Sequence, residues 1–66
     1  MFINDTVKTP AGKGTVQFGM NGGKIVVRVK KNDINWDYLE IKERCESDLE
    51  GNSVLFWFTE KEIDER

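Results

Sequence analysis

The sequence is poor in the residues that most often carry enzyme chemistry. Its 66 residues include no histidine, one cysteine and one proline. The missing histidine removes the commonest general base near neutral pH and the commonest metal ligand. The single cysteine, Cys45, excludes an internal disulfide, and the neighbouring acids Glu43 and Glu46 disfavour a reactive thiolate. We therefore predict a non-catalytic protein that uses no cofactor and no metal.

Long apolar segments are also missing. The first twenty residues hold no apolar run of the roughly 7–15 residues that a signal peptide needs, and no stretch approaches the roughly 20 that span a membrane. We expect a cytoplasmic protein that does not enter a membrane. Apolar residues make up 38% and charged residues 33% of the chain, which is typical of one small globular domain over residues 1–66.

Charge is divided unevenly along the chain, although the net charge is only −2. Residues 1–31 hold six basic residues and one acid, whereas residues 32–66 hold four basic residues and eleven acids. A basic segment can follow a phosphate backbone, so the asymmetry indicates a candidate interaction surface. The simpler interpretation is that strands from both halves interleave and the charges pair or solvate the exterior.

Alternating apolar residues predict a β-hairpin in the first half of the chain. Residues 14–20 and 24–31 each alternate, and the Asn-Gly-Gly between them is typical of a tight turn. A shorter strand is expected over residues 2–8, before Pro10. The alternation assigns to one face Val16, Phe18, Met20, Ile25, Val27 and Val29, and to the other Val26, Arg28 and Lys30.

Residues 32–52 allow two interpretations. One is a helix, because four residues recur at helical spacing. The other is an extended segment over residues 38–44. We expect a short helix or a long excursion at about residues 34–50. The apolar stripe of the helical interpretation consists of Tyr38, Ile41, Cys45 and Leu49.

The end of the chain predicts an aromatic strand followed by a closing turn. Residues 53–58 are apolar on both faces, so each face needs cover, either from the excursion or from a second copy in a homodimer. Thr59 and Glu62 have the spacing of a capping box, which predicts a helical turn near residues 59–63. The two faces of the strand are Val54, Phe56 and Phe58 on one side and Leu55 and Trp57 on the other.

The segment VKTPAGKGTV at residues 7–16 invites comparison with a phosphate-binding loop. Glycines flank Lys13, but the motif needs Ser or Thr directly after the lysine and a helix behind it. Here Gly14 follows Lys13, and the next predicted element is a strand. We interpret the segment as a tight corner that leaves Lys13 exposed.

The order of these elements resembles small SH3-like or Tudor-like β-barrels. The Thr-Pro-x-Gly-x-Gly-Thr-Val corner is similar to the start of such domains in CarD-type transcription factors and at the C-terminus of UvrD-type helicases. Phe56-Trp57-Phe58, followed by residues 60–63, is similar to the end of stand-alone barrels often encoded by phages. The resemblance implies a mainly β protein, a small SH3-like barrel of about five strands. Residues 32–52 depart from it, because a minimal barrel uses a shorter connection there.

The resemblance also implies a non-catalytic interaction module. By position it assigns partner contacts to Trp57, with Arg28 and Lys30 beside it, and Trp36 and Lys13 are further candidates. We expect a protein partner, such as a host or transcription-associated factor bound by a phage or mobile-element protein. Two alternatives stay open, namely nucleic acid bound by the basic first half and an inhibitor that mimics DNA. The acids of such a mimic would be Glu40, Glu43, Glu46, Asp48 and Glu50.

Overall fold

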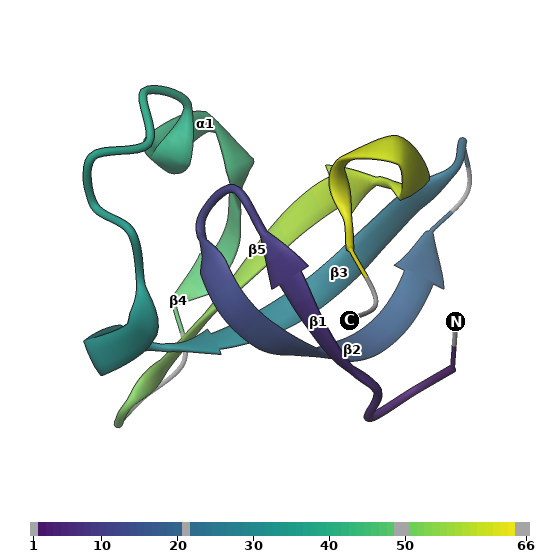
Figure 1. The fold of residues 1–66 in the computed structure, drawn as a ribbon, viewed down its shortest axis with the longest axis horizontal. Coiled ribbons are helices and arrows are strands. Elements are labelled where there is room, and N and C mark those ends of the chain that lie inside the picture. Colours follow the sequence, from purple (N-terminus) through teal and green to yellow (C-terminus); the bar gives the residue numbers. More distant parts are fainter. Residues whose placement is uncertain (1, 21, 49–50, 65–66) are drawn as a thin grey trace.

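Five antiparallel strands make up most of the computed structural model, which describes residues 2–20, 22–48 and 51–64. The strands form one sheet in the order β1-β2-β3-β5-β4 (Figure 1). The prediction of a mainly β fold is therefore confirmed. The elements are β1 (Thr6–Thr9), β2 (Gly12–Met20), β3 (Lys24–Lys30), the 3₁₀ turn η1 (Lys31–Asp33), α1 (Ile41–Arg44), β4 (Cys45–Asp48), β5 (Ser53–Thr59) and the 3₁₀ turn η2 (Glu60–Glu62).

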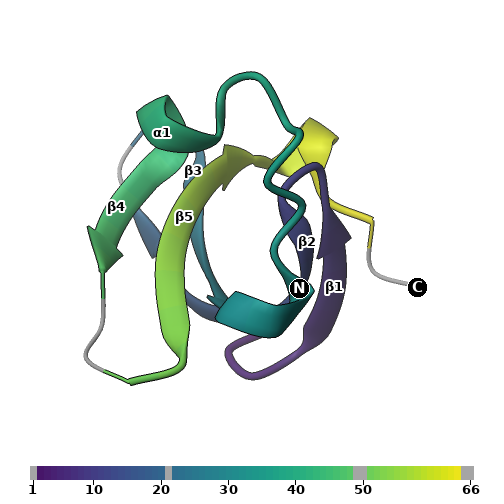
Figure 2. The same cartoon turned by 90° about the vertical axis from the view of Figure 1, so that its left-hand side faces the viewer.

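The sheet curves strongly around one face, so that its edge strands β1 and β4 lie on opposite sides of the interior (Figure 2). These two strands do not pair with each other within the described residues. Residues 34–40 and α1 cross the open side between them. Lys8 in β1 and Asp64 after η2 exchange two backbone hydrogen bonds with N–O distances of 2.6 and 2.9 Å. The segment behind η2 is thereby held against β1.

The concave face of the sheet holds the core. Val27 of β3 lies opposite Val16 of β2 and Phe56 of β5, which aligns one apolar row across three strands. Two buried residues, Ile34 and Ile41, come from the excursion and cover this row from the open side. The core cluster consists of Val7, Ala11, Val16, Val27, Val29, Ile34, Ile41, Val54, Phe56 and Phe58.

The β2–β3 hairpin confirms the predicted strand pair and corrects one of its faces. The register shifts between Val16 and Phe18, so Gln17 forms a bulge in β2. After this extra residue, Phe18 lies opposite Val26, on the side away from the core, and is 44% exposed. The prediction that Phe18 shares a face with Val16 is therefore wrong, because strict alternation does not survive a bulge.

Some predictions concern residues outside the described ranges. These are the turn residue Asn21, the stripe residue Leu49 and the acid Glu50. The side-chain placements predicted for Met20 and Asp48 also lie outside what the structure describes.

The excursion contains less helix than its spacing predicts. The helix α1 covers only four residues, and Cys45 begins β4, where it lies opposite Phe56. Ile41 is buried and Tyr38 packs at the edge of the core, but Cys45 is exposed. The helical stripe is therefore wrong at Cys45. The extended alternative over residues 38–44 is wrong as well, because these residues form turns and α1.

The corner before β2 and the closing turn form as predicted, whereas the first strand is shorter than predicted. Pro10 and Ala11 form the corner between β1 and β2, although the first strand begins at Thr6 and not at residue 2. The Thr59 hydroxyl and the Thr59 backbone amide each donate a hydrogen bond to Glu62 Oε1 over 3.0 Å. This capping box confirms the closing turn at η2.

Candidate functional site

The convex face of the sheet carries basic side chains of the first half. Arg28 of β3 lies opposite Thr15 of β2 and Leu55 of β5, and its side chain is exposed. Lys24 and Lys30 are also exposed and share this face, because alternate residues of a strand point to the same side. Strand β3 therefore presents a row of cations along the outside of the sheet.

Lys13, Arg28 and Lys30 meet around an open hollow of about 510 Å³. Its lining is completed by Thr6, Gly14, Thr15 and Asp33. A second hollow of about 400 Å³ shares Arg28 and Lys30 with the first. Within the described residues, no ion pair joins Lys13, Arg28 or Lys30 to a carboxylate. These three charges are therefore accessible to an anionic ligand.

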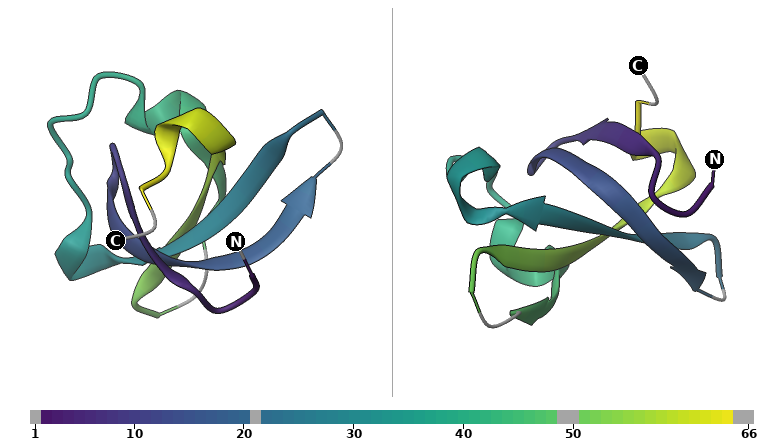
Figure 3. Two further views of the ribbon diagram at one scale, coloured as in Figure 1. Left: turned by 45° about the vertical axis from the view of Figure 1, so that its right-hand side comes forward. Right: turned by 90° about the horizontal axis from the view of Figure 1, so that it is seen from below.

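Two aromatic rings lie on the same convex face, farther along β3. Val26 lies between Phe18 on β2 and Trp57 on β5, and it is fully buried although its side of β3 is otherwise polar. Phe18 is exposed and Trp57 is half-buried. The β2–β3 hairpin that carries Phe18 and Lys24 projects beyond the rest of the molecule (Figure 3). We call this surface the basic-aromatic face, defined by Lys13, Phe18, Lys24, Arg28, Lys30 and Trp57.

Cations and α1 fix the position of Trp57. The Lys24 Nζ lies 4.4 Å and the Arg44 guanidinium 4.2 Å from the centroid of its ring. The indole Nε1 donates a hydrogen bond to the backbone oxygen of Glu43 over 3.3 Å. The excursion thus covers part of the second apolar face of β5. The homodimer that this face also suggested stays a prediction.

Arg44 connects α1 to η2 through a partly buried ion pair. Its Nη1 lies 2.7 Å from Glu62 Oε1, and its Nη2 lies 3.6 Å from Glu40 Oε1. Burial raises the pKa of Glu62, but hydrogen bonds from Arg44 and Thr59 outweigh it and hold that pKa below its ordinary value. The hydrogen bond to Glu62 also raises the pKa of Arg44. Burial raises the pKa of the nearby Tyr38 phenol, against the opposing charge of Arg44.

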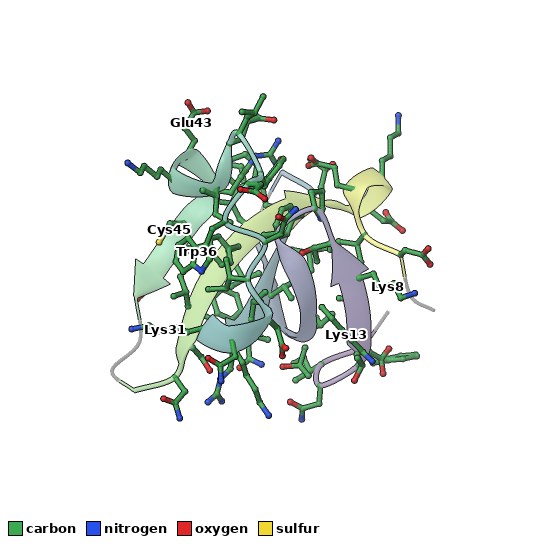
Figure 4. All side chains as sticks on the ribbon, turned by 60° about the vertical axis from the view of Figure 1, so that its left-hand side comes forward. Lys8, Lys13, Lys31, Trp36, Glu43 and Cys45 are labelled. Carbon is green, nitrogen blue, oxygen red and sulfur yellow. The ribbon has the colours of Figure 1, made fainter. Side chains whose placement is uncertain are left out.

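Trp36 lies on another part of the surface, beside β4. Its side chain approaches Cys45, whereas Lys8 and Lys13 lie across the molecule (Figure 4). Trp36 is 62% exposed and borders an apolar hollow of about 160 Å³. This Trp36 hollow is lined by Trp36, Ile41, Lys42, Cys45, Val54 and Phe56.

The predicted contact residues thus divide between two surfaces. Lys13, Arg28 and Lys30 come together around one hollow. Trp57 shares their face and lies opposite Val26, two residues before Arg28 on β3. Trp36 lies at a different hollow. The sequence did not reveal Phe18 as a surface residue, because the bulge at Gln17 reverses its side. Lys24 was included among the basic residues of the first half that could follow a phosphate backbone, but its contact with Trp57 was not predicted.

The described residues contain no group of three or more His, Cys, Asp or Glu side chains that could hold a metal ion. In the same ranges, no helix has the length and apolar character needed to cross a membrane. Comparisons of the chain with protein-family models, curated proteins and solved structures found no match. The geometry of the two surfaces is therefore the basis for proposing a function.

Proposed function

We propose that this chain is a non-catalytic binding module that holds single-stranded nucleic acid on its basic-aromatic face. The observation that carries the proposal is the combination, on one convex face, of four exposed cations with two aromatic rings. Proteins that bind single strands combine the same two features, a positive track for the phosphates and aromatic rings on which bases stack.

The cations supply the first of these features. Lys24, Arg28 and Lys30 follow β3, where side chains on one face repeat about every 6.6–6.8 Å, so they form a line of charge. Lys13 extends this line across β2 at the larger hollow. A flexible phosphate backbone can follow such a line and release its counterions.

The aromatic rings supply the second feature and favour a single strand over a duplex. Phe18 is 44% exposed and offers its ring to a base. Trp57 lies on the same row across Val26, with Lys24 and Arg44 already over its ring. A ring can stack on a base only where the face of that base is free, as in an unpaired strand. The DNA-mimic alternative has less support, because Glu40 is already paired with Arg44 of the helix α1 that follows it.

For the fold, we propose an SH3-like barrel with β4 as an insertion. Two observations support it. Strands β1, β2, β3 and β5 neighbour one another in chain order once β4 is set aside. A 3₁₀ turn, η2, then returns the chain to β1 at the Lys8 and Asp64 bridge.

The proposed function is tested by fluorescence anisotropy with a labelled oligothymidylate of about 12 nucleotides at roughly 50–300 mM salt. The double variant Arg28→Gln/Lys30→Gln should lower the slope of log Kobs against log salt concentration by about 1.4, because each lost phosphate contact removes about 0.7. Phe18→Ala should leave that slope unchanged and weaken binding roughly 5- to 150-fold, the range for one lost stacking contact.

Lys42→Gln/Lys61→Gln is the matched control, since it removes the same charge from exposed positions outside the basic-aromatic face. It should preserve both the affinity and the salt slope of the unmodified protein to a large extent. An equal loss in this control would show attraction by net charge alone. Failure of the unmodified protein to bind the oligonucleotide, or tighter binding to the duplex, would overturn the proposal.

A further inference from the structure

A second surface, separate from the basic-aromatic face, lies along the outer edge of β4. In the described sheet β4 has one strand neighbour, β5. At its start, the Cys45 amide donates to the Lys42 carbonyl of α1. A strand at the edge of a sheet offers unpaired backbone groups on its other side and can accept a further strand.

The Trp36 hollow lies next to this edge. Its walls reach from the exposed ring of Trp36 to the core residues Val54 and Phe56. Its volume, about 160 Å³, is close to that of cavities of roughly 150 Å³ that bind benzene. One apolar side chain of that size therefore fits into it.

The loop that carries Trp36 is anchored in place. The Asn35 amide donates to the carbonyl of Ala11 over 2.7 Å, and its side-chain Nδ2 donates to the carbonyl of Pro10 over 3.2 Å. Asn35 Oδ1 also accepts a hydrogen bond from the Asp37 amide over 3.3 Å. The wall of the hollow is thus fixed to the β1–β2 corner before a ligand arrives, which lowers the entropy lost on binding.

The segment that frames the hollow is acidic. Residues 37–46 contain four acids and two basic residues. Of the two basic residues, Arg44 is already held by Glu62 and Glu40, and Lys42 lines the hollow itself. Once Arg44 and Glu40 are set aside as a pair, three acids, Asp37, Glu43 and Glu46, remain against Lys42. Glu43 extends outward from α1 (Figure 4), and Glu46 follows Cys45 in β4. A partner with basic residues complements this rim.

We propose that an extended basic peptide adds to β4 as a further strand and places one apolar side chain in the Trp36 hollow. Main-chain pairing along the edge supplies affinity, and the hollow selects the apolar residue. The acidic rim selects lysine or arginine on either side of it. A second copy of the chain fits this edge less well, because antiparallel pairing of two β4 strands brings the Glu46 side chains of both copies onto the same short ladder.

A blocked peptide Lys-Thr-Lys-Leu-Lys-Thr-Lys is the probe, titrated into ¹⁵N-labelled protein. Binding should shift the amide signals of residues 45–48 and the indole signal of Trp36. Replacing the central Leu of the peptide by Gly, or Trp36 of the protein by Ala, should each weaken binding roughly tenfold or more, as expected for an anchor side chain in its pocket. Because Trp36 is mostly exposed, the alanine variant should keep the fold.

Two N-methylated versions of the peptide separate strand addition from side-chain contact alone. One carries N-methyl groups on odd residues and the other on even residues. Since alternate amides of a strand face its partner, one version should lose binding and the other should keep it. The protein variant Phe18→Ala is the control on the other face and should bind the peptide normally.

Equal binding of both N-methylated peptides would overturn strand addition, and equal binding of the Leu and Gly peptides would overturn the role of the hollow. Signal shifts confined to the basic-aromatic face would overturn the site. Protection of the β4 amides that rises with protein concentration, in the absence of peptide, would show that a second copy occupies the edge.

Discussion

Gly14 illustrates how one residue position controls the bend on which the basic-aromatic face depends. It lies opposite Val7 of β1 on the concave side of β2. A Cβ there would overlap the Arg28 carbonyl oxygen and come within 2.7 and 2.9 Å of the Val27 and Val29 side chains. The glycine therefore lets β2 pass close to β3, directly behind the hollow that Lys13 and Arg28 line.

Gly14→Ala should lower the free energy of unfolding by roughly 1–3 kcal/mol, the cost of forcing a methyl group into a filled site. Gly19→Ala is the matched control in the same strand, because its Cβ would find its nearest neighbour only at 4.0 Å and its φ is ordinary. That variant should be neutral or slightly stabilising, since alanine restricts the unfolded chain. Urea unfolding followed by tryptophan fluorescence measures both, and equal stability of the two variants would contradict the close approach.

Residue-level prediction from the sequence succeeded where the two-residue period of a strand is uninterrupted. Alternation along β3 was enough to place Arg28 and Lys30 on one face. It failed at Phe18, because the bulge at Gln17 depends on how β2 fits against β3 and leaves no local pattern in the sequence.

At the scale of elements, η2 and α1 differ in how far their form is encoded locally. The capping box of η2 lies within four consecutive residues, Thr59 to Glu62, so its spacing alone predicts the turn. The end of α1 is decided by a distant strand, because Cys45 pairs with β5 opposite Phe56. Helical spacing beyond Ile41 could not reveal that competition.

Glu62 joins these two elements, so its charge should make their docking depend on pH. Glu62→Gln should lower the free energy of unfolding at pH 7 by roughly 1–3 kcal/mol, because charged hydrogen bonds to Arg44 and Thr59 are weakened. The pKa of Glu62 is lowered by folding, so its contribution is present above the ordinary carboxyl value of 4.5 and is lost as the pH falls through the folded-state pKa.

The stability difference between the unmodified protein and Glu62→Gln should therefore shrink as the solution is acidified below about pH 4.5. Thermal unfolding across a pH series measures this difference. Glu60→Gln, an exposed position in the same turn, is the control and should be close to the unmodified protein throughout. A difference that is constant with pH would contradict the role given to the Glu62 charge.

Across the whole molecule, several basic residues of the first half share one face, where Asp33 is the acid of the second half that lines their hollow. In the described residues, the ion pairs of Arg44 join it to Glu40 and Glu62, all from the acidic second half. The cations of the first half instead gather on the convex side of β2 and β3. The sequence showed this asymmetry and allowed charges that solvate the exterior, but it did not show that cations of β2 and β3 meet on one face. The sheet order, which brings these strands together, decides it.

Binding of nucleic acid to the basic-aromatic face can be followed residue by residue in a ¹⁵N NMR titration with a short oligothymidylate. The two tryptophans give separate reporters, because Trp57 lies on that face and Trp36 lies beside β4. We expect the oligonucleotide to shift the signals of Phe18, Arg28 and the Trp57 indole, and to leave Trp36 and residues 45–48 unchanged. Shifts at Trp36 and β4 without shifts along β3, or no shifts at all, would contradict this expectation.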